Sequence, residues 1–225
     1  MKQNVTRRNF LATAGVAALA TGLAQGAEEA PQGKAVKIIG VSCSPRKGMT
    51  TAKAVQAALD AAKAVDPRIE VELIDLGGLN ITGHSPKPPQ DDFAAILPKL
   101  QDPALGGLII GSPSYFRGMS SLCKAFIERC APLREPKMIL ANKPVGVVAV
   151  GAFRNGGQEM TIEQVQAAML CFGMIAVGGN APAFQGATVL STKDDISADE
   201  LGLGTAKKLG AHVVEMALRL APKEA

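Results

Sequence analysis

Short runs of β-branched and other apolar residues alternate along this chain with longer segments that have helical spacing. The expected strands are residues 36–41, 69–76, 107–111, 145–151 and 174–178. The expected helices are residues 50–65, 91–101, 119–130, 156–172 and 199–220. Parallel strands need long crossover connections, so this alternation predicts a parallel sheet with helices on both faces. We therefore expect an α/β fold in one doubly wound domain, with no internal repeat.

The first residues of the chain have the pattern of an export signal rather than of the domain. Lys2, Arg7 and Arg8 precede an apolar stretch at residues 10–23, and small residues follow it. That stretch is shorter than the roughly 20 residues that a membrane-spanning helix needs. Residues 6–11 resemble the twin-arginine motif, whose route carries proteins that are already folded. An ordinary secretory signal with two chance arginines and an uncleaved anchor are the alternatives.

The resemblance to a twin-arginine signal divides the chain into three parts. We expect a twin-arginine signal peptide over residues 1–27, a polar lead-in over 28–34 and the folded domain over 35–225. Cleavage is expected near residues 24–27, which implies a periplasmic protein.

The charge of the chain gives no reason to expect a nucleic-acid partner. The chain has 24 Lys and Arg against 20 Asp and Glu. The three basic residues of the first 27 are matched by no acid, so 21 basic and 20 acidic residues remain beyond them, a net charge of +1. Aromatic residues make up only 4% of the chain, which argues against base-stacking surfaces.

The loop after the first expected strand has the composition of a phosphate site. It offers the hydroxyls of Ser44, Thr50 and Thr51, the cations Arg46 and Lys47, and backbone N–H groups at the start of a helix. A helix cap by Thr50 beside two solvated cations is the alternative. Neither G-x-x-x-x-G-K-[ST] nor G-x-G-x-x-G is present. A phosphatase loop C-x5-R starting at Cys43 is excluded, because Met49 stands at the arginine position.

Two more loops follow strands at the same expected sheet edge. Residues 112–118 contain the adjacent aromatics Tyr115 and Phe116, which from the sequence alone can equally belong to the core. Residues 151–159 are rich in glycine, which permits close approach of the backbone to a flat ligand. The three loops together favour a planar, phosphorylated cofactor.

These stretches resemble the flavodoxin-like NAD(P)H-dependent FMN reductase superfamily, nearest to the iron–sulfur flavoproteins and the tryptophan-repressor-binding-protein-like quinone oxidoreductases. The resemblance rests on motifs in order along residues 36 to about 180: Ser44-Pro45-Arg46-Lys47-Gly48 with Thr50-Thr51, Gly111-Ser112-Pro113-Ser114-Tyr115-Phe116 with Met119-Ser120, Lys124-Ala125-Phe126-Ile127, Asn155-Gly156-Gly157-Gln158-Glu159, and Gly173-Met174. It implies a flavodoxin-like five-stranded sheet of order 2-1-3-4-5.

The resemblance also implies FMN as the cofactor and NAD(P)H as a possible donor. Ser44, Arg46, Thr50 and Thr51 would hold the FMN phosphate. Pro113, Ser114, Tyr115 and Phe116 would frame the isoalloxazine ring. Ala152, Phe153, Asn155, Gly156 and Gly157 would close over the other side of the cofactor.

The chain departs from these relatives at several positions. Residues 80–89 contain no cysteine where iron–sulfur flavoproteins carry a compact cysteine motif, so no cluster and no metal site is expected. The cysteines at positions 43, 123 and 130 are expected to be buried thiols. Phe172 stands where the quinone oxidoreductases often have histidine, and no catalytic acid is assigned. His84 has two interpretations, a proton donor at the flavin mouth or a solvated loop histidine.

The function that follows is an exported FMN-dependent oxidoreductase that passes electrons to a small acceptor such as a quinone or an oxidised metal. The alternatives are a flavodoxin-like electron carrier served by a periplasmic or membrane redox partner, and a module that has lost the flavin. The resemblance implies that the flavin lies near a subunit boundary. The apolar face of the expected helix at 119–130 must cover the sheet, but residues 131–133 and the loop at 77–90 add apolar and proline-rich surface beside the expected flavin mouth. We therefore expect a homodimer, or by the resemblance a homotetramer.

Overall fold

The computed structural model describes residues 33–87 and 89–221, so the predicted signal peptide lies outside the described residues. Its sheet is built on the strands β1 (Val36–Ser42), β2 (Ile69–Asp75), β3 (Leu105–Tyr115), β5 (Pro144–Gly151) and β6 (Ile175–Ala176). These strands lie in the order β2-β1-β3-β5-β6, and all of their pairings are parallel. The predicted α/β fold and its strand order are therefore confirmed.

The number of strands differs from the prediction, because the fifth position of the sheet is shared by two short strands. Both β6 and β7 (Ala187–Leu190) pair with β5. The run at 174–178 ends early because Gly178 and Gly179 lead into an irregular segment with a cis bond before Pro182. A two-residue strand, β4 (Gly118–Met119), adds a hairpin at the end of β3.

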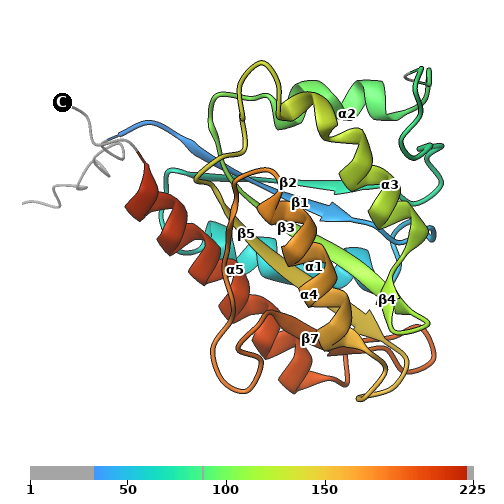
Figure 1. Cartoon of the computed structure of the whole chain (residues 1–225). Helices are drawn as coiled ribbons and strands as arrows, with labels where there is room; N and C mark the ends of the chain where they lie inside the picture. The colour runs from blue at the N-terminus through green and yellow to red at the C-terminus, as the bar shows by residue number, and fades with distance from the viewer. Residues whose placement is uncertain (1–32, 88, 222–225) are drawn as a thin grey trace, which may run out of the picture. The chain divides into compact units, whose positions relative to one another are not determined.

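The helices cover both faces of the sheet, as predicted. They are α1 (Thr50–Lys63), α2 (Phe93–Leu100), α3 (Ser121–Arg129), α4 (Gln158–Leu170) and α5 (Glu200–Leu220), with a 3₁₀ turn η1 (Ala131–Leu133). One apolar core lies between the sheet and α2, α3 and α4, and a second core lies between the sheet and α1 and α5. Figure 1 shows α3 and α4 crossing one face of the sheet with α1 behind it. Within the described residues, no helix is long and apolar enough to cross a membrane.

Candidate functional site

The ends of three neighbouring strands gather the predicted loops at one edge of the sheet. Ser42 at the end of β1 pairs with Gly111 of β3, and Pro113 of β3 pairs with Val150 of β5. The segments that follow, residues 43–49, 116–118 and 152–157, therefore leave the sheet side by side. This carboxyl edge is where open α/β sheets bind ligands.

The first turn of α1 places two buried threonines at a helix end without a side-chain cap. Its N-cap residue, Met49, makes no side-chain cap. Thr50 and Thr51 are buried, with Thr51 only 1% exposed. The hydroxyl of Ser42, at the end of β1, is buried and has no hydrogen-bond partner among the described residues. Buried donors at an uncapped helix N-terminus, with the positive end of the helix dipole behind them, fit an anion such as a phosphate.

The backbone of the first loop is held open around this helix end. The Ser44 hydroxyl accepts a hydrogen bond from the Arg46 N–H at 3.2 Å. The Asp75 carboxylate, at the end of β2, accepts the N–H of Gly48 at 2.6 Å and that of Gly77 at 3.1 Å. These contacts shape the loop before any ligand binds.

Arg46 points to a different partner from the one predicted for it. Its guanidinium lies 2.8 Å from the Asp194 carboxylate, and both side chains are about half exposed. The Asp194 carboxylate, and then the Tyr115 hydroxyl, raise the pKa of Arg46. Arg46 therefore joins the first loop to the turn after β7.

The second and third loops are locked together by hydrogen bonds. The Ser114 hydroxyl donates to the Gly156 carbonyl at 2.8 Å, and the Thr161 hydroxyl donates to Ser114 at 3.2 Å. Gly157 has φ +91°, and a Cβ atom there would lie 2.5 Å from the Arg117 Cα atom. Only glycine permits this close approach, which fixes the distance between the two loops.

The aromatic residues of these loops lie on the surface and not in the core. Tyr115 is 42% exposed, Phe153 is 76% exposed and Phe116 is completely exposed. This decides between the two sequence interpretations of Tyr115 and Phe116 in favour of a surface role. Of the other predicted site residues in these loops, Pro113 is buried, whereas Ala152 and Asn155 are exposed.

Two residues that position the third loop were not found by sequence analysis. Gln158 is buried, and its amide nitrogen donates to the Phe153 carbonyl at 2.7 Å, while its amide oxygen has no partner among the residues that the structure describes. The buried Asp199 forms an ion pair with Arg154 and accepts the Leu190 N–H at 2.6 Å. Gln158 stands within a recognised motif, but nothing in the sequence around Asp199 connects it to a loop 45 residues away.

The carboxylate of Asp199 links this loop to the pH dependence of stability. Burial acts to raise its pKa, but the hydrogen bonds from Arg154 and from the Leu190 and Gly202 backbones outweigh it and lower the pKa. Because the folded pKa lies below the unfolded value of about 3.9, this stabilisation is complete above that value and is lost as the pH falls through the folded pKa.

We expect Asp199→Asn to lower the free energy of unfolding by about 1–2 kcal/mol at pH 7, since Arg154 is partly exposed. Urea unfolding of both proteins at pH 7, 4 and 2.5 measures this difference. It should shrink toward zero at the lowest pH. A difference that grows on acidification would contradict the assigned ion pair.

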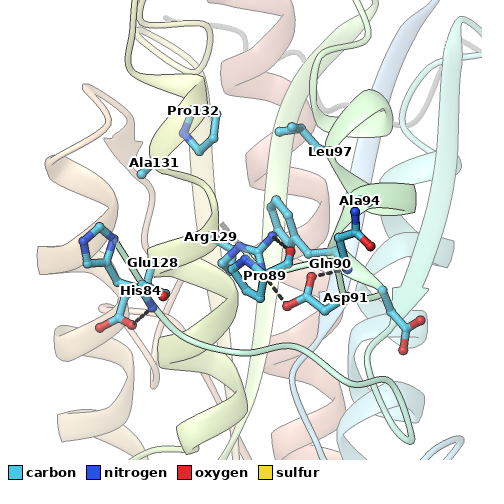
Figure 2. Close-up of a pocket in the computed structure, with 13 residues that line it drawn as sticks. His84, Pro89, Gln90, Asp91, Ala94, Leu97, Glu128, Arg129, Ala131 and Pro132 are labelled. Carbon is cyan, nitrogen blue, oxygen red and sulfur yellow. Dashed lines mark hydrogen bonds and ion pairs between the residues drawn. The ribbon is translucent and has the colours of Figure 1, made fainter. Parts of the chain in front are cut away.

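His84 lies away from the three loops. The His84 N–H donates to Glu128 in the last turn of α3 at 2.7 Å, and His84 lines a groove of about 820 Å³ with Asp91, Arg129 and Pro132 (Figure 2). The three loops meet at the N-terminal end of α3, where the Ser120 hydroxyl donates a hydrogen bond to the Cys43 carbonyl. This placement gives no support to His84 as a proton donor at the flavin mouth.

The predicted burial of three thiols is confirmed. Cys43, Cys123 and Cys130 are fully buried. Burial, with the neighbouring thiols, raises the pKa values of Cys43 and Cys130. Thiols with raised pKa values are poor nucleophiles, so Cys43 and Cys130 have a structural role.

The fold defines a flavodoxin-like protein, with three loops gathered at the carboxyl edge of its sheet. Comparison with known proteins agrees: residues 36–189 match the family described as NADPH-dependent FMN reductase. The chain belongs to this family, which confirms FMN as its cofactor at the level of the family.

Individual relatives support the same assignment. An iron–sulfur flavoprotein from Methanocaldococcus jannaschii is 40% identical over 192 residues, which cover 80% of this chain and 97% of that protein. The Trp repressor binding protein from Bacillus subtilis has a similar structure, with a TM-score of 0.53 and 26% identity over 78% of this chain and 98% of that one. A WrbA-like flavodoxin from Agrobacterium tumefaciens has a TM-score of 0.58 at 19% identity, over 83% and 99% of the two chains, and shows the shared fold.

Proposed function

We propose that this protein is an exported FMN-dependent oxidoreductase that transfers electrons to a small acceptor such as a quinone or an oxidised metal. The observation that carries the proposal is the first turn of α1, which has no side-chain cap and holds the buried Thr50 and Thr51 beside two interlocked loops. FMN, when bound, supplies the redox chemistry, and the protein supplies orientation and electrostatics.

Different residues at the carboxyl edge of the sheet bind different parts of the cofactor. Ser44, Thr50 and Thr51 bind the phosphate of the cofactor, with Arg46 available once it leaves Asp194. The segment 113–116 frames the isoalloxazine ring, and the segment 152–157 covers its other side. Gln158 and Asp199 hold that covering segment in place.

The electron donor distinguishes two candidate functions. The family name points to NADPH, which is scarce outside the cytoplasm. The second candidate is therefore an electron carrier that receives electrons from a periplasmic or membrane partner. The exposed Tyr115, Phe116 and Phe153 at the edge favour it, since an aromatic surface of this kind suits contact with another protein.

Steady-state kinetics separate these candidates. The oxidoreductase is expected to turn over NADPH or NADH with a soluble quinone, with rates that saturate in both. A protein with full flavin content that reduces no quinone with either nucleotide would favour the carrier. A protein that neither binds flavin nor turns over would contradict both.

Export by the twin-arginine route is a separate part of the proposal, and it rests on residues 6–11. Replacing both Arg7 and Arg8 by lysine is expected to retain the precursor in the cytoplasm, because that route requires the arginine pair. Cell fractionation with mass determination of the N-terminus measures it. Continued export of the double variant would indicate an ordinary secretory signal.

We also propose that the mature chain forms at least a dimer, with a tetramer as the larger assembly. The surface in question includes η1 and the loop at 77–90, which line the groove of Figure 2. Light scattering of the FMN-bound protein at micromolar concentration tests it, and a mass near that of one protomer would refute it.

A further inference from the structure

The second and third loops carry the same dipeptide at their tips. Phe116-Arg117 follows β3, and Phe153-Arg154 follows β5. The hydrogen bond from Ser114 to the Gly156 carbonyl and the close contact of Gly157 with Arg117 hold the two tips against each other. Two phenylalanine rings therefore stand on the surface, one at the tip of each of these two joined loops.

The backbone of the first dipeptide is in an unusual conformation. Phe116 has φ +50° and Arg117 has φ +64°, so two consecutive bulky residues lie in the left-handed region. Such a conformation is unfavourable for residues with large side chains, and it places the Phe116 ring fully in solvent. Both residues are the central residues of the two-residue turn that joins β3 to β4, and two positive φ values are what a type I′ hairpin turn requires.

The loops that carry these rings have an excess of positive charge. The three loops, residues 43–49, 116–118 and 152–157, contain four cations and no acidic residue. Arg46 and Arg154 are paired with Asp194 and Asp199, respectively. Among the described residues, Arg117 makes only a long hydrogen bond of 3.5 Å to the Asn155 carbonyl. Its positive charge is therefore not balanced by a carboxylate.

We propose that the acceptor of this protein is a planar aromatic anion, bound against the rings of Phe116 and Phe153 with its negative group on Arg117. This inference rests on the proposed function and names its substrate class: quinones that carry a sulfonate or carboxylate. The reaction is balanced, since one quinone, one NADPH and one proton give one hydroquinone and one NADP⁺. Neutral quinones lack the group that Arg117 recognises.

Kinetics with a matched pair of acceptors test the role of Arg117. The two acceptors are 1,4-naphthoquinone and 1,4-naphthoquinone-2-sulfonate. For each acceptor, the KM of the variant is divided by the KM of the unchanged protein. Because each ratio compares two proteins with the same acceptor, the difference in reduction potential between the acceptors does not affect it. Arg117→Gln is expected to raise the KM for the sulfonate about fivefold, the upper range for an exposed charge pair, and to change the KM for the neutral quinone less than twofold. Equal changes for both acceptors, or no change for either, would overturn the proposal.

A control variant removes a charge that the proposal does not use. Lys193 is exposed in the turn after β7 at the same edge of the sheet, and it also has a positive φ. Lys193→Gln is expected to leave both KM values within twofold. An effect equal to that of Arg117→Gln would show general electrostatic attraction and contradict a specific site.

The stacking role of Phe116 is tested in the same way. Phe116→Ala is expected to raise the KM for both quinones about fivefold, because an aromatic contact does not depend on the acceptor charge. Phe184→Ala is the matched control, since Phe184 is an exposed ring (68%) in the segment between β6 and β7. Equal effects of the two substitutions would contradict the assignment.

Binding of a redox-inert probe makes the inference independent of turnover. Calorimetry with naphthalene-2-sulfonate on the protein as purified is expected to show binding that Arg117→Gln weakens about fivefold. If this binding is present but no quinone is reduced, the proposed function fails and the anion site stands. If quinones are reduced but the probe does not bind, the anion site is wrong and the proposed function stands.

Discussion

Replacing Ser44 and Thr51 together by alanine is expected to weaken FMN binding about 10²-fold or more. Both side chains are buried, Ser44 in the loop before α1 and Thr51 in its first turn. A hydrogen bond to a charged acceptor contributes about 1.5–3 kcal/mol, so the loss of two corresponds to at least this factor. Titration of the flavin-free protein with FMN, followed by quenching of flavin fluorescence, gives the affinity.

Riboflavin provides the sharpest control, because it has the same ring system and no phosphate. The double variant is expected to bind riboflavin as the unchanged protein does, so that the preference for FMN over riboflavin falls by the same factor. Replacing Thr82 and Ser85, two hydroxyl residues in the segment after β2, is expected to alter neither affinity. Unchanged FMN affinity in a folded double variant would place the phosphate elsewhere.

The close contact between α1 and α5 predicts a large loss of stability for Gly210→Ala. A Cβ atom at this buried position would lie 1.9 Å from the Ala58 carbonyl oxygen, a backbone atom that cannot move without shifting α1. We expect the free energy of unfolding to fall by about 2–3 kcal/mol, as in other overpacked cores. Urea unfolding followed by circular dichroism measures the change.

A second glycine of α5, Gly204, predicts a change in the free energy of unfolding of the opposite sign. Apart from the neighbouring backbone of α5 itself, no heavy atom of the described residues lies within 4 Å of the Cβ position at Gly204. Gly204→Ala is therefore expected to raise stability by about 0.5–1 kcal/mol, since alanine has the higher helix propensity. Destabilisation by both substitutions, or by neither, would contradict the assigned contact between the helices.

Local sequence patterns were sufficient to predict most of the sheet and the first loop. The β-branched runs at 36–41 and 145–151 are buried on both faces, so their composition alone identifies them as central strands. Ser44, Thr50 and Thr51 are next to a strand and a helix that the pattern also identifies. Their positions therefore follow from their places in the chain.

The features that were not predicted depend on contacts between distant residues. The pair Arg154–Asp199 and the pair Arg46–Asp194 each join segments far apart in the sequence, so no local pattern identifies them. The strand β7 has only four residues, and an irregular segment separates it from β6. Such short strands form because β5 offers a free edge, which is a property of the folded sheet.

The central claim, that this chain holds FMN at the carboxyl edge of its sheet, is tested most directly by analysis of the bound group. The protein is purified from its native compartment, its absorbance spectrum is recorded, and flavin and iron are measured after heat release. We predict a flavin spectrum with FMN as the released flavin, about one per chain, and no stoichiometric iron. A colourless protein, a majority of FAD or stoichiometric iron with acid-labile sulfide would contradict this account.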